Sequence, residues 1–303
     1  MAAMELWEQY PPEGSAQKHT VTGNVWRARG VAGFGLAARD IYTYLPPSYN
    51  DSRKRYPVLY MQDGQNIFDD VMSYVGEWGA DEAAESLAKQ GFECIIVAIP
   101  NGGKARMREY GPWSRETSPR ETSPRTSKQW GTLNSQGEAY VDYVAKTVKP
   151  LIDQSFRTRP SAPFTGIGGS SMGALIALYA ALTRPTVFGY CLAMSPSIWF
   201  GFGKLFDVVR VTPKTKTRFY MDMGQRETPE EKSSGMLMDA RQMHALLHAQ
   251  HFDVAYIEDS EGIHHESSWR CRFPAALEWF LNARARPEPP QAGHTHVKQV
   301  SRF

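Results

Sequence analysis

The sequence has little of what secreted, membrane-bound or nucleic-acid-binding proteins need. Its 303 residues include three cysteines, scattered and odd in number, which indicates reduced thiols in a cytoplasmic protein rather than a disulfide framework. No apolar run approaches the roughly 20 residues of a membrane span, and the N-terminus has no signal-peptide pattern. The net charge is only +2, so we expect no nucleic-acid or membrane partner. Nothing in the sequence sets the oligomeric state.

Strand-like and helix-like segments alternate along the chain with short connections. Strands are expected at 19–29, 38–45, 56–61, 94–100, 164–169, 189–195, 217–224 and 253–259, and helices at 81–89, 137–156, 172–183, 236–247 and 267–281. This alternation predicts an α/β fold, a mostly parallel sheet with helices on both faces. We expect an N-terminal extension at 1–18, a single catalytic domain at 19–283, and a Pro-rich, disordered tail at 284–303.

The strongest chemical signal is "GSSMG", Gly169 to Gly173, which matches G-x-S-x-G. It follows an apolar strand and opens an apolar helix, the context in which this motif makes a sharp turn and exposes the central serine. A Cβ at either flanking glycine would press on neighbouring backbone, and the helix N-terminus offers N–H groups to a developing oxyanion. The motif predicts Ser171 as a nucleophile. The alternative is a glycine-rich turn without chemistry.

A nucleophilic serine needs a base and an acid, and on this fold the chain order is Ser, acid, His. His264 and His265 lie on the loop after the last strand, where an α/β sheet presents residues to its carboxyl edge. His244 and His248 share a helix face with no evident third metal ligand, and we expect neither metal nor organic cofactor. For the acid, Asp222 ends a strand, Glu227 follows in the loop, and Asp259 lies only five residues before His264, too near to reach behind it.

Eight blocks of the sequence resemble a known family in its order, over about residues 38–283. The family is the α/β-hydrolase esterases related to enterochelin (ferric siderophore) esterases, feruloyl esterases and S-formylglutathione hydrolase. The blocks are "YPVLYMQDGQNIFDD", "EWGADEAAESL", "IVAIPN", "GEAYVDYVAKTVKPLIDQSFRTRP", "GIGGSSMGALIALYAA", "VFGYCLAMSPSIWF", "MDMGQRE" and "GIHHESSWRCRFPAALEWF".

The resemblance implies a single-domain α/β-hydrolase fold and a serine esterase acting on a small-molecule ester through an acyl-enzyme. By position it implies Ser171 as nucleophile, His264 as base and Glu227 as acid. The backbone N–H groups of Gln65 and Met172 would hold the oxyanion. Ala174 stands where the family often has glycine, with little consequence expected in a helix. Thioester hydrolysis, acyl transfer and a non-catalytic ligand-binding relative remain alternatives.

The residues that touch the substrate are less well defined. Trp199 and Trp78 either face the substrate or pack in the core, while Asp63 and Asn66 are expected to brace the oxyanion loop rather than touch the substrate. Residues 101–135 form a long polar loop expected to border the active site, and the resemblance favours Arg108 to Tyr110 as its nearest part. Residues 101–131 hold seven Lys/Arg and three Glu, which favours acidic or polyphenolic substrates unless Arg–Glu pairs compensate the charge.

Overall fold

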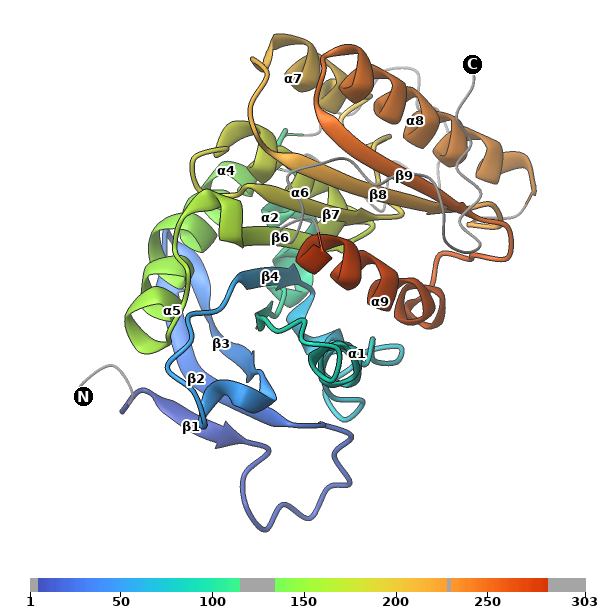
Figure 1. Ribbon diagram of the computed structural model, residues 1–303. Coiled ribbons are helices and arrows are strands. Elements are labelled where there is room, and N and C mark those ends of the chain that lie inside the picture. The colour runs from blue at the N-terminus through green and yellow to red at the C-terminus, as the bar shows by residue number, and fades with distance from the viewer. Residues whose placement is uncertain (1–4, 115–133, 228–229, 283–303) are drawn as a thin grey trace.

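The sheet has nine strands in the described part of the chain and runs through the whole molecule (Figure 1). The computed structural model describes residues 5–114, 134–227 and 230–282. The strand order is β1-β2-β3-β5-β4-β6-β7-β8-β9. The strands are β1 (Trp7–Tyr10), β2 (Asn24–Gly33), β3 (Leu36–Leu45), β4 (Val58–Gln62), β5 (Ile95–Ile99), β6 (Thr165–Ser170), β7 (Tyr190–Met194), β8 (Arg218–Gly224) and β9 (Asp253–Asp259).

Strands β4 to β9 are parallel, and β1 to β3 form an antiparallel edge that joins them through β3 and β5. The helices are α1 (Ala80–Ala88), α2 (Arg106–Glu109), α4 (Gly137–Tyr143), α5 (Lys149–Ser155), α6 (Met172–Thr183), α7 (Lys204–Val211), α8 (Glu230–Ala249) and α9 (Glu266–Asn282). A π-helical turn, η4 (Val144–Val148), joins α4 to α5. This is the α/β fold expected from the alternation of segments.

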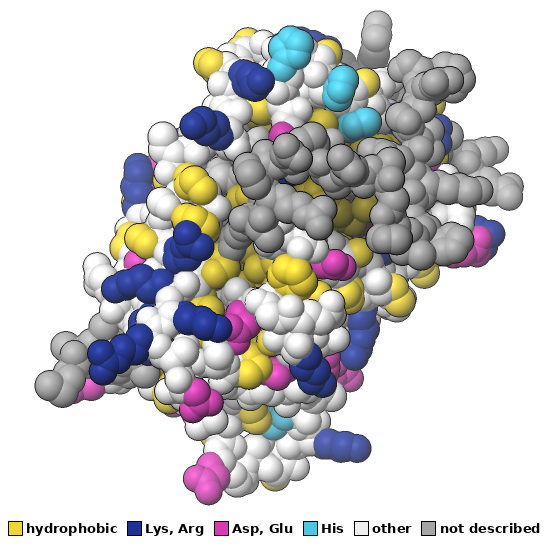
Figure 2. All heavy atoms as spheres, in the orientation of Figure 1, with side chains coloured by type: hydrophobic (Ala, Val, Ile, Leu, Met, Phe, Trp, Pro, Cys, Tyr) yellow, Lys and Arg dark blue, Asp and Glu magenta, His cyan; other side chains and the backbone are white. Residues whose placement is uncertain are grey.

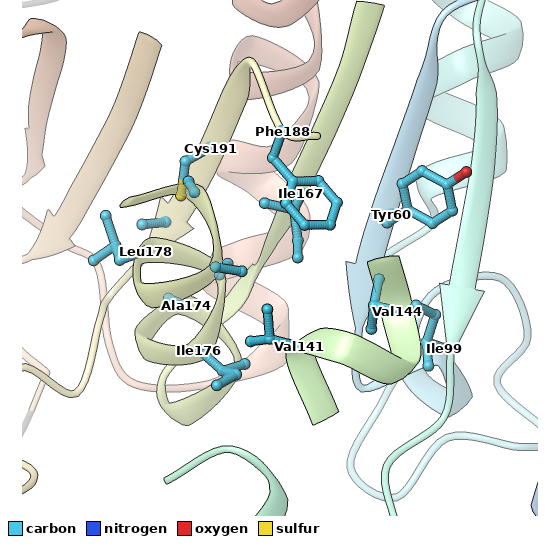
Figure 3. Close-up of a cluster of buried hydrophobic side chains, with 14 of the residues drawn as sticks. Tyr60, Ile99, Val141, Val144, Ile167, Ala174, Ile176, Leu178, Phe188 and Cys191 are labelled. Atoms are coloured by element: carbon cyan, nitrogen blue, oxygen red, sulfur yellow. The ribbon is translucent and has the colours of Figure 1, made fainter. Parts of the chain in front are cut away.

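Alternate residues of the parallel strands enter two separate cores. Leu59 and Met61 of β4 pack with α1 and α9 on one face of the sheet. Tyr60 of β4 belongs to the other core, with α4, η4 and α6 to α8. Figure 3 shows Val141 and Val144 of this second core beside the sheet. Helix α6 is apolar almost all round, and ten of its twelve residues are buried, as a central helix requires.

The N-terminal region differs from the expectation. The second strand begins at Asn24 rather than residue 19, because Thr20 and Thr22 donate their N–H groups to the carboxylates of Asp69 and Asp81 rather than to a neighbouring strand. Strand β1 lies within the segment expected as an extension and pairs with β2. Trp7 and Tyr10, at its two ends, are buried, so this segment adds to the core of the sheet.

The carboxyl ends of the parallel strands meet at one edge of the sheet. The turn after β4, the serine after β6, and the loops after β7, β8 and β9 all begin there, where open α/β sheets carry their sites. On the face in Figure 2, Lys and Arg side chains lie among Asp and Glu side chains. None of the helices in residues 5–114, 134–227 and 230–282 has the length and hydropathy needed to cross a bilayer.

Candidate active site

Ser171 occupies the turn between β6 and α6 in a strained backbone conformation. Its φ is 55° and its ψ is −122°, a combination that costs free energy for a residue with a Cβ. Three backbone hydrogen bonds hold the turn: the Ser171 N–H donates to the Met194 carbonyl, and the Ser171 carbonyl accepts from the N–H groups of Leu175 and Ser197. The turn leaves Ser171 partly exposed at the edge of the sheet.

The glycines on either side of the turn are required by close packing. A Cβ on Gly169 would lie 2.9 Å from Cβ of Gln62, and a Cβ on Gly173 would lie 3.0 Å from the same atom. The Gly173 position is also 3.1 Å from Oδ2 of Asp63. Both glycines therefore allow the turn to pack against the end of β4, as the motif led us to expect.

Three side chains from separate loops form one hydrogen-bonded chain. The Ser171 Oγ lies 2.9 Å from Nε2 of His264, and Nδ1 of His264 lies 2.6 Å from Oε2 of Glu227. His264 is half-buried, whereas the Glu227 carboxylate is 1% exposed. Ser170, the neighbouring serine, is buried in β6. The structure thus brings together the three residues that the resemblance selected.

The Glu227 carboxylate is held by donors on both oxygens. Oε1 accepts from the Gly224 N–H at 2.7 Å and from the Ser195 hydroxyl at 2.5 Å, and Arg272 Nη2 lies 3.7 Å away. Burial raises the pKa of Glu227, but the hydrogen bonds from His264 and Ser195 outweigh it and hold the pKa below its usual value. Glu227 is therefore ionised at neutral pH.

The other candidate acids do not reach the histidine. Asp222 is completely buried in β8 and contacts Arg272 Nη1 at 3.3 Å. Its carboxylate oxygens have no hydrogen bond to any described residue, and burial raises its pKa to about 6 despite Arg272. Asp259 Oδ1 accepts from the Glu261 N–H in the turn after β9. Only Glu227 of these three bonds His264.

The other candidate histidines in the described part of the chain do not bond Ser171. His265 is exposed and lies 3.0 Å from the hydroxyl of Ser267, so it points away from Ser171, as expected. His244 stacks on Tyr256 at 5.1 Å between ring centroids. No group of three or more His, Cys, Asp or Glu side chains suited to a metal ion occurs among the described residues.

The turn after β4 lies beside Ser171 and carries Gln65. Neither the Gln65 nor the Met172 N–H donates to another backbone group in the described chain, which leaves both free for an oxyanion. The Asp63 carboxylate receives two hydrogen bonds from Arg106, at 2.7 and 2.8 Å, and one from Asn101 at 2.6 Å. Asp63 therefore braces this turn, as expected.

Tyr110, expected near the substrate, lies in the core instead, and Trp78 takes the core position that the sequence left open. Tyr110 is completely buried, and its hydroxyl accepts the Asp63 N–H at 3.0 Å. Trp78 is 3% exposed and packs on Trp269 and Phe273. The expectation for Tyr110 is corrected, and of the two alternatives for Trp78 the structure has core packing, because both rings pack on aromatic neighbours.

Trp199 and Arg108 are exposed, which keeps them available to a substrate. Trp199 is 42% exposed and follows Ser197 by two residues. The front of the 101–135 loop lies beside the oxyanion turn through Arg106 and Asp63. Four of the basic residues in this loop lie outside the described residues: Arg115, Arg120, Arg125 and Lys128.

The sequence assigns no role to Ser195, Ser197 or Arg272, and it places Arg106 only among the basic residues of the 101–135 loop, whereas Arg106 pairs with Asp63. The Ser197 hydroxyl lies 3.1 Å from that of Ser171. Ser195 and Ser197 belong to "SPS" at the end of β7, on the same edge as Ser171, and this placement was a usable signal. Arg272 interrupts the buried face of α9, and a buried arginine implies a buried acid as its partner.

A parallel sheet with a serine at this sharp turn, beside a histidine, defines the α/β-hydrolase fold. The putative esterase family model matches residues 37–280. The chain therefore belongs to this family, and the protein is a carboxylesterase.

Individual relatives are distant. The uncharacterized protein YbbA of Bacillus subtilis is 27% identical over 243 residues, which are 78% of this chain and 90% of that protein. The siderophore triacetylfusarinine C esterase of Aspergillus fumigatus is 30% identical over 144 residues, 48% of this chain and 45% of that protein. An IroE-like serine hydrolase from Shewanella oneidensis superimposes with a TM-score of 0.68 at 21% identity, over 84% of this chain and 79% of that one.

Proposed function

We propose that the protein hydrolyses small carboxylic esters through an acyl-enzyme on Ser171. The observation that carries this proposal is the hydrogen-bonded chain Ser171–His264–Glu227. Ser171 Oγ attacks the ester carbonyl carbon while its proton passes to His264 Nε2. The ester C–O bond then breaks, and His264 returns the proton to the leaving alcohol. Water attacks the acyl-enzyme by the same route, and Ser171 regains its proton.

Glu227 has a defined part in this cycle. Its carboxylate bonds His264 Nδ1, so the imidazole presents Nε2 as the acceptor toward Ser171. It also stabilises the imidazolium that forms when Ser171 gives up its proton. The pKa of Glu227, which its hydrogen bonds hold below the usual value against burial, keeps this negative charge in place at neutral pH.

The oxyanion is held by the Gln65 and Met172 N–H groups. Met172 is the first residue of α6, so its N–H points outward and carries the positive end of the helix dipole. Gln65 lies in a short 3₁₀ turn, η2 (Gly64–Asn66). Arg106 and Asn101 fix this turn through Asp63, which preorganises the donors before the negative charge develops.

For the substrate class, we propose esters of the siderophore or feruloyl kind. Support comes from the relative named as a siderophore triacetylfusarinine C esterase and from the half-exposed indole of Trp199 near Ser197. An exposed aromatic ring can stack on a planar acyl or phenolic group.

Active-site labelling tests the reaction. A fluorophosphonate should modify one serine, and peptide mass spectrometry should find the label on Ser171. Initial rates with p-nitrophenyl, feruloyl and siderophore esters then rank the substrates, with neutral and anionic esters compared at low and high salt to test the basic loop. A protein that takes no label and hydrolyses none of these esters would overturn the proposal.

A further inference from the structure

The Ser195 hydroxyl bonds Oε1 of Glu227, the carboxylate oxygen that does not bond His264. Ser195 follows β7, is completely buried, and has a φ of 45°. Its N–H donates to the Asp222 carbonyl at 2.9 Å, which ties the turn to the end of β8. A left-handed backbone position of this kind favours glycine, yet the chain keeps a side chain here.

The hydroxyl of Ser195 makes three hydrogen bonds, and their direction is fixed by chemistry. The indole Nε1 of Trp269 at 3.0 Å and Nη2 of Arg272 at 2.9 Å can only donate. They occupy both lone pairs of the Ser195 oxygen. Its single proton therefore has one acceptor, Oε1 of Glu227 at 2.5 Å. The hydroxyl has a single orientation and aims its proton at the carboxylate.

This arrangement settles which way the Glu227 carboxylate faces. With Oε1 held by Ser195 and Gly224, Oε2 is the oxygen left for His264. We propose that Ser195 is a positioning residue: its hydroxyl orients the Glu227 carboxylate toward His264. The inference rests on the proposed function, because it assigns Ser195 an effect only through Glu227 and His264.

The charged groups around Glu227 come from three elements. His264 precedes α9, Arg272 lies within α9, and Asp222 lies on β8. Arg272 lies between the two carboxylates, 3.3 Å from Asp222 and 3.7 Å from Glu227, and so is shared. The Ser195 hydroxyl bonds Glu227 and not the Asp222 carboxylate, so this hydroxyl distinguishes the two acids.

The test compares Ser195→Gly with Ser195→Ala. Both remove the hydroxyl, but glycine suits a φ of 45° and alanine does not. We expect both to lower kcat by about 10- to 100-fold, the effect of one hydrogen bond to a charged group, with KM little changed. The rate of fluorophosphonate labelling at Ser171 should fall by the same factor.

The pH profile separates positioning from a structural role. A hydrogen bond to the ionised carboxylate lowers its pKa, so losing the bond raises the pKa of Glu227. The acidic limb of kcat/KM should therefore move to higher pH in both variants. Ser195→Cys keeps the side-chain shape with a weaker donor and should give an intermediate kcat, which also keeps the test valid if the other two variants fold poorly.

Thr217→Val is the matched control. Thr217 is also buried, and its hydroxyl donates to the Phe188 carbonyl away from Ser171, so kcat and the acidic limb should stay as in the wild type. If the Ser195 variants match this control while Ser171→Ala is inactive, the inference fails and the proposed function stands. If Ser171→Ala is fully active, the proposed function itself fails.

Discussion

The Nε2 atom of His264 lies 2.9 Å from the Oγ atom of Ser171, although 93 residues separate them in the sequence. The parallel sheet makes this possible, because β6 and β9 both run toward the same edge. Ser171 leaves β6 at that edge, and His264 enters from the loop after β9. The site depends on the sheet for its geometry, and each side chain can be tested separately.

Replacement of the two adjacent serines should have opposite results. Ser171→Ala removes the proposed nucleophile and should lower kcat by on the order of 10³- to 10⁶-fold. Ser170→Ala removes a hydroxyl buried in β6 and should keep most activity. Initial rates on a p-nitrophenyl ester measure both. An inactive Ser170→Ala beside an active Ser171→Ala would reverse the assignment.

Substitution of the two buried acids, Asp222 in β8 and Glu227 in the loop after it, should have different effects on kcat. Glu227→Gln cannot hold His264 with a negative charge, so we expect kcat to fall by roughly 10²- to 10⁴-fold. Asp222→Asn changes a carboxylate that contacts Arg272 but not His264 and should keep kcat within about tenfold. Steady-state kinetics of the two variants measure this. Loss of activity in Asp222→Asn alone would transfer the role to Asp222.

The sequence predicts the nucleophile well and the acid poorly, for a physical reason. The turn at Ser171 is local: its glycines, strand and helix are contiguous, and α6 has the expected bounds. The choice of Glu227 over Asp222 depends on which carboxylate reaches a histidine from another loop, and the resemblance supplied it. Ser195 and Arg272 act across β7, β8 and α9. The sequence places each at a strand end or on a buried helix face, but which partner each one bonds depends on how these distant elements pack.

Tyr110 and Trp78 illustrate the same limit. Each lies close in sequence to residues at the site, but burial decides whether an aromatic ring meets substrate or core, and burial is set by distant partners. Tyr140 packs on Tyr110, and α9 supplies Trp269 and Phe273 to Trp78.

Asp222 should make the stability depend on pH in a defined window. Its pKa is raised by burial from 3.8 to about 6 in the folded protein. The folded state therefore binds the proton more tightly, and this contribution is present below pH 3.8 and lost as the pH rises to about 6. In the wild type, the contribution of Asp222 to the free energy of unfolding, measured by urea titration, should fall as the pH rises from 3.8 to about 6. Asp222→Asn should lack it, and identical pH dependence in the two proteins would contradict the assignment.

Gly173→Ala should impair the reaction more than the fold. The new Cβ would lie 3.0 Å from Gln62 Cβ and 3.1 Å from Asp63 Oδ2, so the oxyanion turn must shift. We expect kcat to fall on the order of 10²-fold, because small displacements of positioned groups have effects of that size. Ala174→Gly is the control: it should cost about 1 kcal/mol of stability and leave kcat unchanged. Equal kcat in both variants would show that the turn tolerates the shift.

Asp69 should anchor the N-terminal segment to the domain. Its buried carboxylate accepts hydrogen bonds from Tyr10 at 2.5 Å and Thr20 at 3.2 Å, and lies 2.6 Å from His19 Nδ1. Asp69→Asn should therefore lower the free energy of unfolding by about 1–3 kcal/mol and speed proteolysis near residue 19. The Ser171 site lies on other elements, so kcat/KM should be unchanged.

The exposed neighbour of Asp69 provides the comparison. Asp70→Asn should change stability by less than about 0.5 kcal/mol, because Asp70 is exposed and its carboxylate accepts only from the hydroxyl of nearby Ser73 among the described side chains. Burial raises the pKa of Asp69, but hydrogen bonds from Tyr10 and His19 hold it below 3.8. The stabilisation is thus present above pH 3.8 and lost as the pH falls through the folded-state pKa. Wild type and Asp69→Asn should converge in acid, and a gap that persists there would mean that packing, not the carboxylate, holds the segment.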